Sequence, residues 1–209
     1  MKHLSKTLAA AGLTALLSSA AFAAQVERVR GTVDKADGST LTIKTEDGKT
    51  ETVDVAGAKF AWVVPSSLDA IKDGVFIGTA TKGENPMTAL EVVLFPESMR
   101  GTGEGHYGWD SITDHTAGAG AKVKSAMTNG TVKADKAASG GERTLTVSYG
   151  KDGSKEIVVP SSAPIVAFEP ADKAILTPGS KVFAVVAKDG AKADGKLIAV
   201  GKDGLTPPM

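Results

Sequence analysis

The chain consists mainly of short segments in which apolar and polar residues alternate. Alternation over four to eight residues, bounded by turn residues, is typical of β-strands that bury one face. In the first half, the segments predicted as strands are residues 29–33, 40–45, 52–55, 60–64, 75–81 and 89–95. In the second half they are residues 131–134, 144–149, 156–159, 165–168, 182–187 and 197–200. Turn dipeptides such as Asp47-Gly48 join neighbouring segments and predict antiparallel hairpins.

Each half also contains one short stretch with helical spacing. In residues 66–72 a serine stands where a helix cap is expected, and Leu68 and Ile71 follow three positions apart. Residues 171–176 hold the corresponding place in the second half, ahead of Pro178-Gly179. Only one or two helical turns fit in either stretch. The predicted fold class is therefore all-β.

The two halves repeat one another. Four motifs of the first half return in the same order in the second, 99 residues later at the first match and 104 or 105 later at the others. They are Gly31-Thr32-Val33, Leu41-Thr42-Ile43, Asp47-Gly48 and Val53-Asp54-Val55, which return as Gly130-Thr131-Val132, Leu145-Thr146-Val147, Asp152-Gly153 and Ile157-Val158-Val159. An insertion around residues 137–141 accounts for the change of offset.

This repetition predicts two tandem small antiparallel β-barrels. Each barrel would be OB-like, with five to six strands and one short helical turn, because closure removes the exposed edges of a small sheet. The predicted divisions are residues 24–97 for the first barrel and 128–209 for the second. A long Gly-rich connecting segment, residues 98–127, would join them.

Residues 1–23 have the pattern of a cleavable export signal. Lys2 and Lys6 give a basic start, an uncharged apolar stretch covers residues 8–17, and Ala21-Phe22-Ala23 supplies small residues before a cut at Ala24. The apolar stretch is too short to cross a bilayer comfortably. The sequence therefore predicts a periplasmic or secreted protein that does not span the membrane.

Charge and cysteine content exclude several classes of function. The chain has 24 basic and 24 acidic residues, with no basic stripe to hold a phosphate backbone, so nucleic acid is excluded as a partner. It has no cysteine, which excludes thiol catalysis, redox chemistry and thiolate metal sites. The sequence also lacks the GxSxG nucleophile elbow, and no helix is expected after the glycines of residues 101–108 to present its N-terminus to a phosphate. We therefore predict that the protein is not an enzyme.

The repeated motifs resemble a known family. The order Gly-Thr-Val, polar turn, Leu-Thr-Ile or Leu-Thr-Val, Asp-Gly and a late glycine before a strand is similar to a widespread exported bacterial domain of unknown function. The resemblance covers most of both halves. Residues 95–110 look like a more restricted subgroup, some of whose members have metal-transport names. The resemblance implies a small β-barrel fold and an exported location, and it supplies no catalytic residues.

The connecting segment, residues 98–127, contains the unusual residues of the chain. It holds both histidines outside the signal, His106 and His115, together with Tyr107 and Trp109. A connection of this length inside a compact protein is either functional or disordered. We therefore expect any function to lie in this segment.

Three interpretations of the segment remain open. Tyr107 and Trp109 would pack it across the two barrels, with glycines letting the backbone lie close. Alternatively, these aromatic residues and Arg100 would contact a peptide, glycan or protein partner. The third interpretation is a metal site.

The metal hypothesis rests on four side chains. Two imidazoles and two thioethers suit copper, or zinc if nearby carboxylates join them. The four candidate ligands are His106, His115, Met99 and Met127. Against this interpretation, the histidines are nine residues apart and no HxH or HxxxH motif is present.

Together these patterns predict a non-enzymatic periplasmic binding or interaction protein, in which two barrels dock through the aromatic segment and present a groove to an unknown partner. The alternative is periplasmic handling of copper or zinc through the connecting segment. No other cofactor is predicted.

Overall fold

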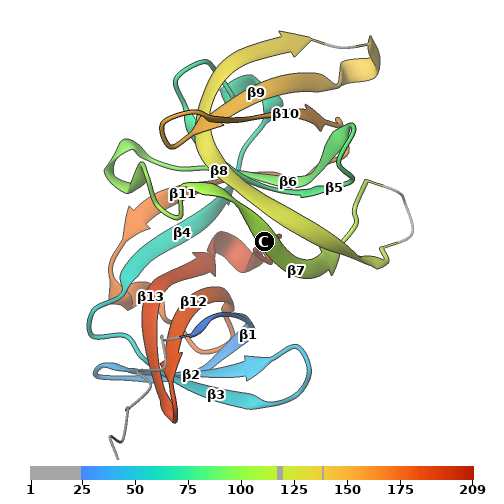
Figure 1. Cartoon of the computed structure of the whole chain (residues 1–209). Helices are drawn as coiled ribbons and strands as arrows, with labels where there is room; N and C mark the ends of the chain where they lie inside the picture. The colour runs from blue at the N-terminus through green and yellow to red at the C-terminus, as the bar shows by residue number, and fades with distance from the viewer. Residues whose placement is uncertain (1–24, 117–119, 138) are drawn as a thin grey trace, which may run out of the picture.

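The computed structural model describes residues 25–116, 120–137 and 139–209 (Figure 1). The predicted export signal and its cut before Ala24 lie outside these residues. Within them the chain is all-β, as predicted, and its helical elements are single short turns. The part of the chain described includes no helix with the length and apolar character needed to cross a membrane.

The strands follow the predicted order closely. In the first half they are β1 (Gln25–Asp37), β2 (Thr40–Thr45), β3 (Thr50–Asp54), β4 (Lys59–Pro65), β5 (Phe76–Lys82) and β6 (Met87–Leu94). After β7 (Gly105–Thr113), the second half contains β8 (Lys122–Ala137), β9 (Arg143–Tyr149), β10 (Gly153–Val159), β11 (Ile165–Ala171), β12 (Lys181–Asp189) and β13 (Lys192–Gly201). The short turns are η1 (Leu68–Ala70), η2 (Glu97–Met99), η3 (Ser139–Gly141), η4 (Lys173–Ile175) and η5 (Lys202–Gly204). Each predicted strand overlaps an observed one, and both predicted helical turns are present.

The connecting segment is not the loop that its sequence suggests. It contains β7 and the start of β8, which pair as an antiparallel hairpin with an irregularity between Gly108 and Ser111. Glycines occupy several positions at which an apolar residue would have shown strand alternation. Backbone pairing to β8 nevertheless holds the segment in an extended conformation. The sequence pattern did not predict these two strands in the connecting segment.

The prediction of two tandem barrels was wrong. The thirteen strands of the described residues form one mixed sheet, in the order β10-β9-β8-β5-β6-β11-β4-β13-β12-β1-β2-β3, with β7 paired to β8. Strands of one half lie between strands of the other. Because β5 pairs with β8, and β1 with β12, neither half forms a closed unit from its own strands.

Both ends of the sheet curl back on it. Strand β3 pairs with β13, and β10 pairs with β6, each in parallel. The pairings therefore close two rings of five strands. The terminal ring consists of β1, β2, β3, β13 and β12, and the middle ring consists of β8, β9, β10, β6 and β5. Strands β4 and β11 pair with each other between the rings, as Figure 1 shows.

Each ring takes its first three strands from one half and its last two from the other. Matching hydrogen bonds accompany this exchange. The N–H of Gly74, from the first half, donates to the carbonyl oxygen of Val132 over 2.8 Å. The N–H of Gly179, from the second half, donates to the carbonyl oxygen of Val33 over the same distance. The two halves are therefore joined by backbone hydrogen bonds at equivalent positions.

The buried side chains follow the same division. One apolar cluster fills the terminal ring and includes Leu41, Ile43 and Ile198. A second fills the middle ring and includes Ile77 and Leu145. Both clusters combine side chains from the two halves. A third cluster, which includes Phe168, Phe183 and Leu197, lies between the rings and forms one wall of the cleft described below.

Gly31 is expected to be among the most sensitive positions in the fold. A Cβ at Gly31 would collide with the carbonyl oxygen of Lys44 on the paired strand, and a Cβ at Gly130 would collide with that of Ser148. A paired backbone cannot move aside as the end of a flexible side chain can. We therefore expect Gly31→Ala to lower the free energy of unfolding by about 3 kcal/mol. Urea unfolding of the variant and of the unchanged protein measures this difference in free energy.

Gly108→Ala is the matched control, because a Cβ at Gly108 meets no atom within 4 Å. Its effect should stay below about 1 kcal/mol. If the two variants unfold at the same urea concentration, the close approach at Gly31 does not constrain the ring.

Candidate binding cleft between the two rings

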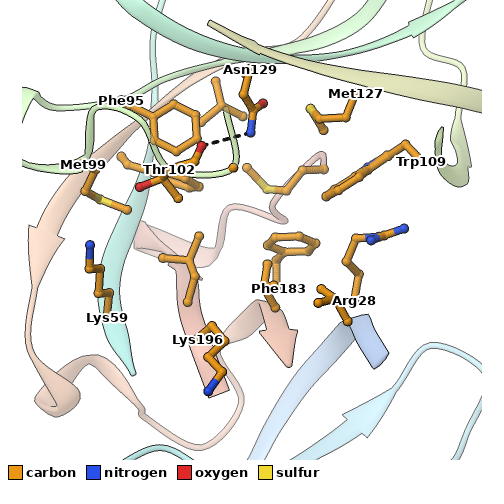
Figure 2. A pocket seen from close by; sticks show the side chains of 18 of the residues that line it. Arg28, Lys59, Phe95, Met99, Thr102, Trp109, Met127, Asn129, Phe183 and Lys196 are labelled. Carbon is orange, nitrogen blue, oxygen red and sulfur yellow. Dashed lines mark hydrogen bonds between the residues drawn. The ribbon is translucent and has the colours of Figure 1, made fainter. Parts of the chain in front are cut away.

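A cleft with a volume of about 760 Å³ opens between the terminal ring and the middle ring (Figure 2). Its volume falls within the range of roughly 300–1,000 Å³ that is typical of small-molecule sites. Most of the wall is apolar, and eight of its twelve apolar side chains are aromatic or contain sulfur. These residues are Val26, Val93, Phe95, Met99, Tyr107, Trp109, Met127, Phe168, Phe183, Val185, Leu197 and Met209.

The β7–β8 hairpin positions the aromatic part of this wall. Tyr107 is paired with Met127, and both line the cleft. His106 is paired with Thr128, one position away, so both side chains project from the opposite face of the hairpin. Trp109 comes two positions after Tyr107, so the strand alternation directs it to the cleft as well.

Trp109 is held by contacts from its own strand, β7, and from the terminal ring. Its ring lies 6.1 Å from that of Tyr107 and 6.4 Å from that of Phe183 between centroids. The guanidinium carbon of Arg28, on β1, lies 4.1 Å from the centroid of the indole, a geometry in which a cation is attracted to the ring face. The indole N–H is buried and has no hydrogen-bond partner among the described residues.

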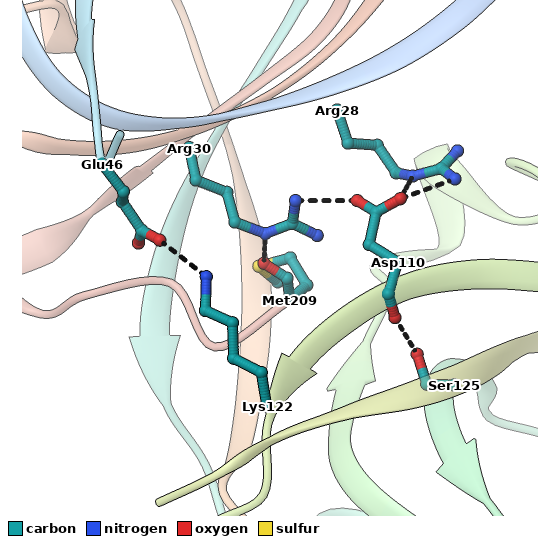
Figure 3. Close-up of polar contacts among 7 residues, drawn as sticks. All are labelled: Arg28, Arg30, Glu46, Asp110, Lys122, Ser125 and Met209. Atoms are coloured by element: carbon teal, nitrogen blue, oxygen red, sulfur yellow. Dashed lines mark hydrogen bonds and ion pairs between the residues drawn. The ribbon is translucent and has the colours of Figure 1, made fainter. Parts of the chain in front are cut away.

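An ion-pair bridge next to Trp109 ties the two rings together (Figure 3). One oxygen of Asp110 accepts from Nε of Arg28 at 3.0 Å, and the other accepts from Arg30 at 2.8 Å. Arg30 also donates to the backbone oxygen of Met209 at 2.7 Å, and Ser125 donates to that of Asp110 at 2.7 Å. Burial alone would raise the pKa of Asp110, but the hydrogen bonds from the two arginines outweigh it and leave that pKa below its ordinary value. The bridge therefore stays charged at neutral pH.

Few polar groups reach the cleft. Asn129 donates through Nδ2 to the carbonyl oxygen of Thr102 at 3.2 Å, while its Oδ1 is buried and has no partner among the described residues. The hydroxyl of Tyr107 donates to the carbonyl oxygen of Gly103 at 3.0 Å, and burial raises its pKa. Lys59 and Lys196 complete the polar lining with Arg28. The described residues of the lining include no aspartate, glutamate or histidine.

The structure brings two of the three predicted contact residues into the cleft and places the third elsewhere. Tyr107 and Trp109 both line the cleft, whereas Arg100 does not. Nε of Arg100 donates to Glu97 at 2.6 Å, and its NH2 donates to the carbonyl oxygen of Gly74 at 2.9 Å. Arg100 therefore fastens the turn at η2 to the middle ring.

The four predicted metal ligands do not converge. Met99 and Met127 line the cleft. His106 lies on the other face of β7, where its Nδ1 is 2.9 Å from the hydroxyl of Thr128, and burial lowers its pKa. His115 lines a second, more polar hollow of about 830 Å³. Across the described residues, no three His, Cys, Asp or Glu side chains cluster as metal ligands would.

Several cleft residues were not predicted from the sequence. Phe168 and Phe183 have the alternation of ordinary core positions in β11 and β12, and only the exchange of strands turns them toward a shared cleft. Lys59 and Lys196 carry no sequence signal that separates them from other surface lysines.

Comparison with protein-family models, curated proteins and solved structures finds no match to this chain. The resemblance of the repeated motifs to an exported bacterial domain therefore stays a prediction.

Proposed function

We propose that this is a non-enzymatic, exported binding protein whose ligand enters the cleft between the two rings. The observation that carries the proposal is the lining: a largely apolar, partly aromatic cleft that remains open to solvent. Val26 and Tyr107 are the large apolar residues most exposed among those described, and both lie in its wall. Exposed apolar surface beside a concave site is typical of a ligand-binding surface.

The chemistry of the lining favours binding over turnover. Its described residues supply aromatic faces, thioethers, one amide and three cationic side chains, and these groups orient and hold a ligand. A general acid or base at neutral pH is most often an imidazole or a carboxylate, and the described lining has neither. The alternative function, copper or zinc handling, has no comparable set of converging ligands in its support.

Fluorescence of the neutral apolar dye N-phenyl-1-naphthylamine tests the proposal. We expect the purified protein to bind one dye molecule per chain with a rise in dye emission. Trp109→Ala removes the largest aromatic face of the cleft and should weaken binding about tenfold, which corresponds to about 1.4 kcal/mol.

Tyr149→Ala is the control, because Tyr149 lies near His106 on the face of the hairpin that points away from the cleft. It should bind the dye as the unchanged protein does. Absence of dye binding, or equal loss in both variants, would remove the cleft as the site. Hydrolysis of a simple ester, phosphate or glycan by the purified protein would show an enzyme instead.

A further inference from the structure

We infer that the cleft takes an anionic amphiphile, meaning a molecule with one long apolar chain and a single carboxylate, sulfate or phosphate headgroup. This inference rests on the proposed function and adds the class of ligand to it. It follows from where the charges of the cleft lie and from which of them already have ion-pair partners.

The charge of the cleft is of one sign. Its lining contains Arg28, Lys59 and Lys196, and no acidic residue among the residues described. Arg28 already has an ion-pair partner, because its NH2 lies 2.9 Å from an oxygen of Asp110. Lys59 and Lys196 form no ion pair with any described residue; they differ in this from Lys188, which pairs with two glutamates. The lining therefore carries two positive charges that have no ion-pair partner among the described residues.

These two lysines lie together at one side of the cleft. In the parallel pairing of β4 with β13, Lys59 is opposite Leu197, so Lys196 is the next residue along. Both lysine residues are exposed, so their ammonium groups are accessible to a ligand that enters from solvent. Figure 2 shows them across the cleft from Trp109 and Met127, with Phe183 between.

The opposite side of the cleft suits an apolar chain. Trp109, Met127 and Phe183 offer aromatic and thioether surface, and thioethers adapt to chains of different shape. Covering apolar surface stabilises a complex by about 25 cal/mol per Å², whereas a buried charge without a partner costs several kcal/mol. A ligand with its chain against Trp109 and its charge beside Lys59 satisfies both conditions.

The second hollow has a different charge pattern from the cleft. It is comparable in size, but its lining carries four carboxylates: Glu27, Glu46, Asp47 and Glu51. Carboxylates there already pair with lysines, for example Glu46 with Lys122 at 3.6 Å. Arg28, Arg30 and Lys122 also line this hollow, so its charges are of both signs, whereas the charged side chains of the cleft are all cationic.

Competition against bound N-phenyl-1-naphthylamine tests the inference. The competitors share a twelve-carbon chain and are used below their micelle concentrations: dodecanoate, dodecyl sulfate, dodecyl phosphate, dodecanol and dodecyltrimethylammonium. We expect each anion to displace the dye at a concentration at least about tenfold lower than dodecyltrimethylammonium, with dodecanol between them. Differences among the three anions identify the preferred headgroup.

The double variant Lys59→Gln/Lys196→Gln should keep its affinity for the neutral dye and lose the preference, so that anion and cation differ by less than about threefold. The control, Lys72→Gln/Lys133→Gln, removes the same charge from exposed lysines outside the cleft and should keep the preference. If the dye binds but the anions have no advantage, or if the advantage survives Lys59→Gln/Lys196→Gln, the inference is overturned and binding in the cleft stands. If the dye does not bind, the proposed function itself fails.

Discussion

Produced as separate polypeptides, residues 25–104 and residues 105–209 will each fail to form a folded monomer, and they will regain the native structure when mixed. The terminal ring needs β12 and β13 to complete β1, β2 and β3, and the middle ring needs β5 and β6 to complete β8, β9 and β10. Separation exposes the apolar faces of Leu41, Ile43 and Leu145, which are fully buried in the whole chain. Each such side chain contributes about 1.5–3 kcal/mol when fully buried, so exposing only a few of them removes an amount comparable to the 5–15 kcal/mol by which a domain is normally stable.

Circular dichroism, amide chemical-shift dispersion and size-exclusion chromatography of each fragment and of the mixture measure this. The full chain, refolded under the same conditions, is the reference, and the mixture should elute at its volume. A monomeric fragment 25–104 with a cooperative unfolding transition would contradict the prediction. Such a fragment would mean that β5 and β6 can close onto β1, β2 and β3 of their own half.

Glu91 will make the protein less stable as the pH rises from about 4.5 to about 8. This glutamate, on β6, is 1 % exposed; one oxygen accepts from the N–H of Ala80 at 3.1 Å, and the other has no partner among the described residues. Burial raises its pKa from 4.5 to about 8, against the smaller lowering effects of the Ala80 N–H and the charge of Arg30. The native state therefore holds a proton that the unfolded chain releases above pH 4.5.

Because the native state binds the extra proton, the contribution of Glu91 to stability is greatest below pH 4.5 and falls until the glutamate also ionises in the native state, near pH 8. Glu91→Gln cannot ionise. Relative to it, the unchanged protein should lose on the order of 4 kcal/mol between pH 4.5 and pH 8. Urea unfolding of both proteins across this range measures the difference.

Glu97→Gln is the control, since Glu97 is exposed and the hydrogen bond from Arg100 lowers its pKa below the ordinary value. Its stability should differ from that of the unchanged protein by a constant amount over the same range. Parallel curves for Glu91→Gln and the unchanged protein would show that the buried carboxyl does not control this dependence.

The sequence predicts the individual strands of this fold well, because their signal is local. Residues 40–45 and 144–149 alternate apolar and polar side chains, and Asp47-Gly48 marks a turn, so each element follows from a few neighbouring residues. The partner of each strand is not a local property. Strands β5 and β12 are preceded by equivalent glycines, Gly74 and Gly179, and nothing in either segment distinguishes its own half from the other.

Some residues of the candidate site can likewise be recognised in the sequence, and others cannot. Tyr107 and Trp109 are conspicuous in sequence because aromatic residues are few in this chain, and both lie in the cleft. Phe183 and Lys59 reach the same cleft from β12 and β4, which approach β7 only after the halves exchange strands. The histidines were equally conspicuous, yet the strand period places His106 on the opposite face from Tyr107.

The exchange of strands also determines the order in which the two rings can be completed as the chain is synthesised from its N-terminus. Strands β1, β2 and β3 are made first, but their ring is incomplete until β13, which ends at Gly201, has been made. The middle ring, made entirely of later strands, has all its partners once Val159 is present. Contacts between residues so distant in sequence form slowly. The part of the protein that is synthesised first is therefore the last to become native, and the nascent chain stays open for most of its synthesis.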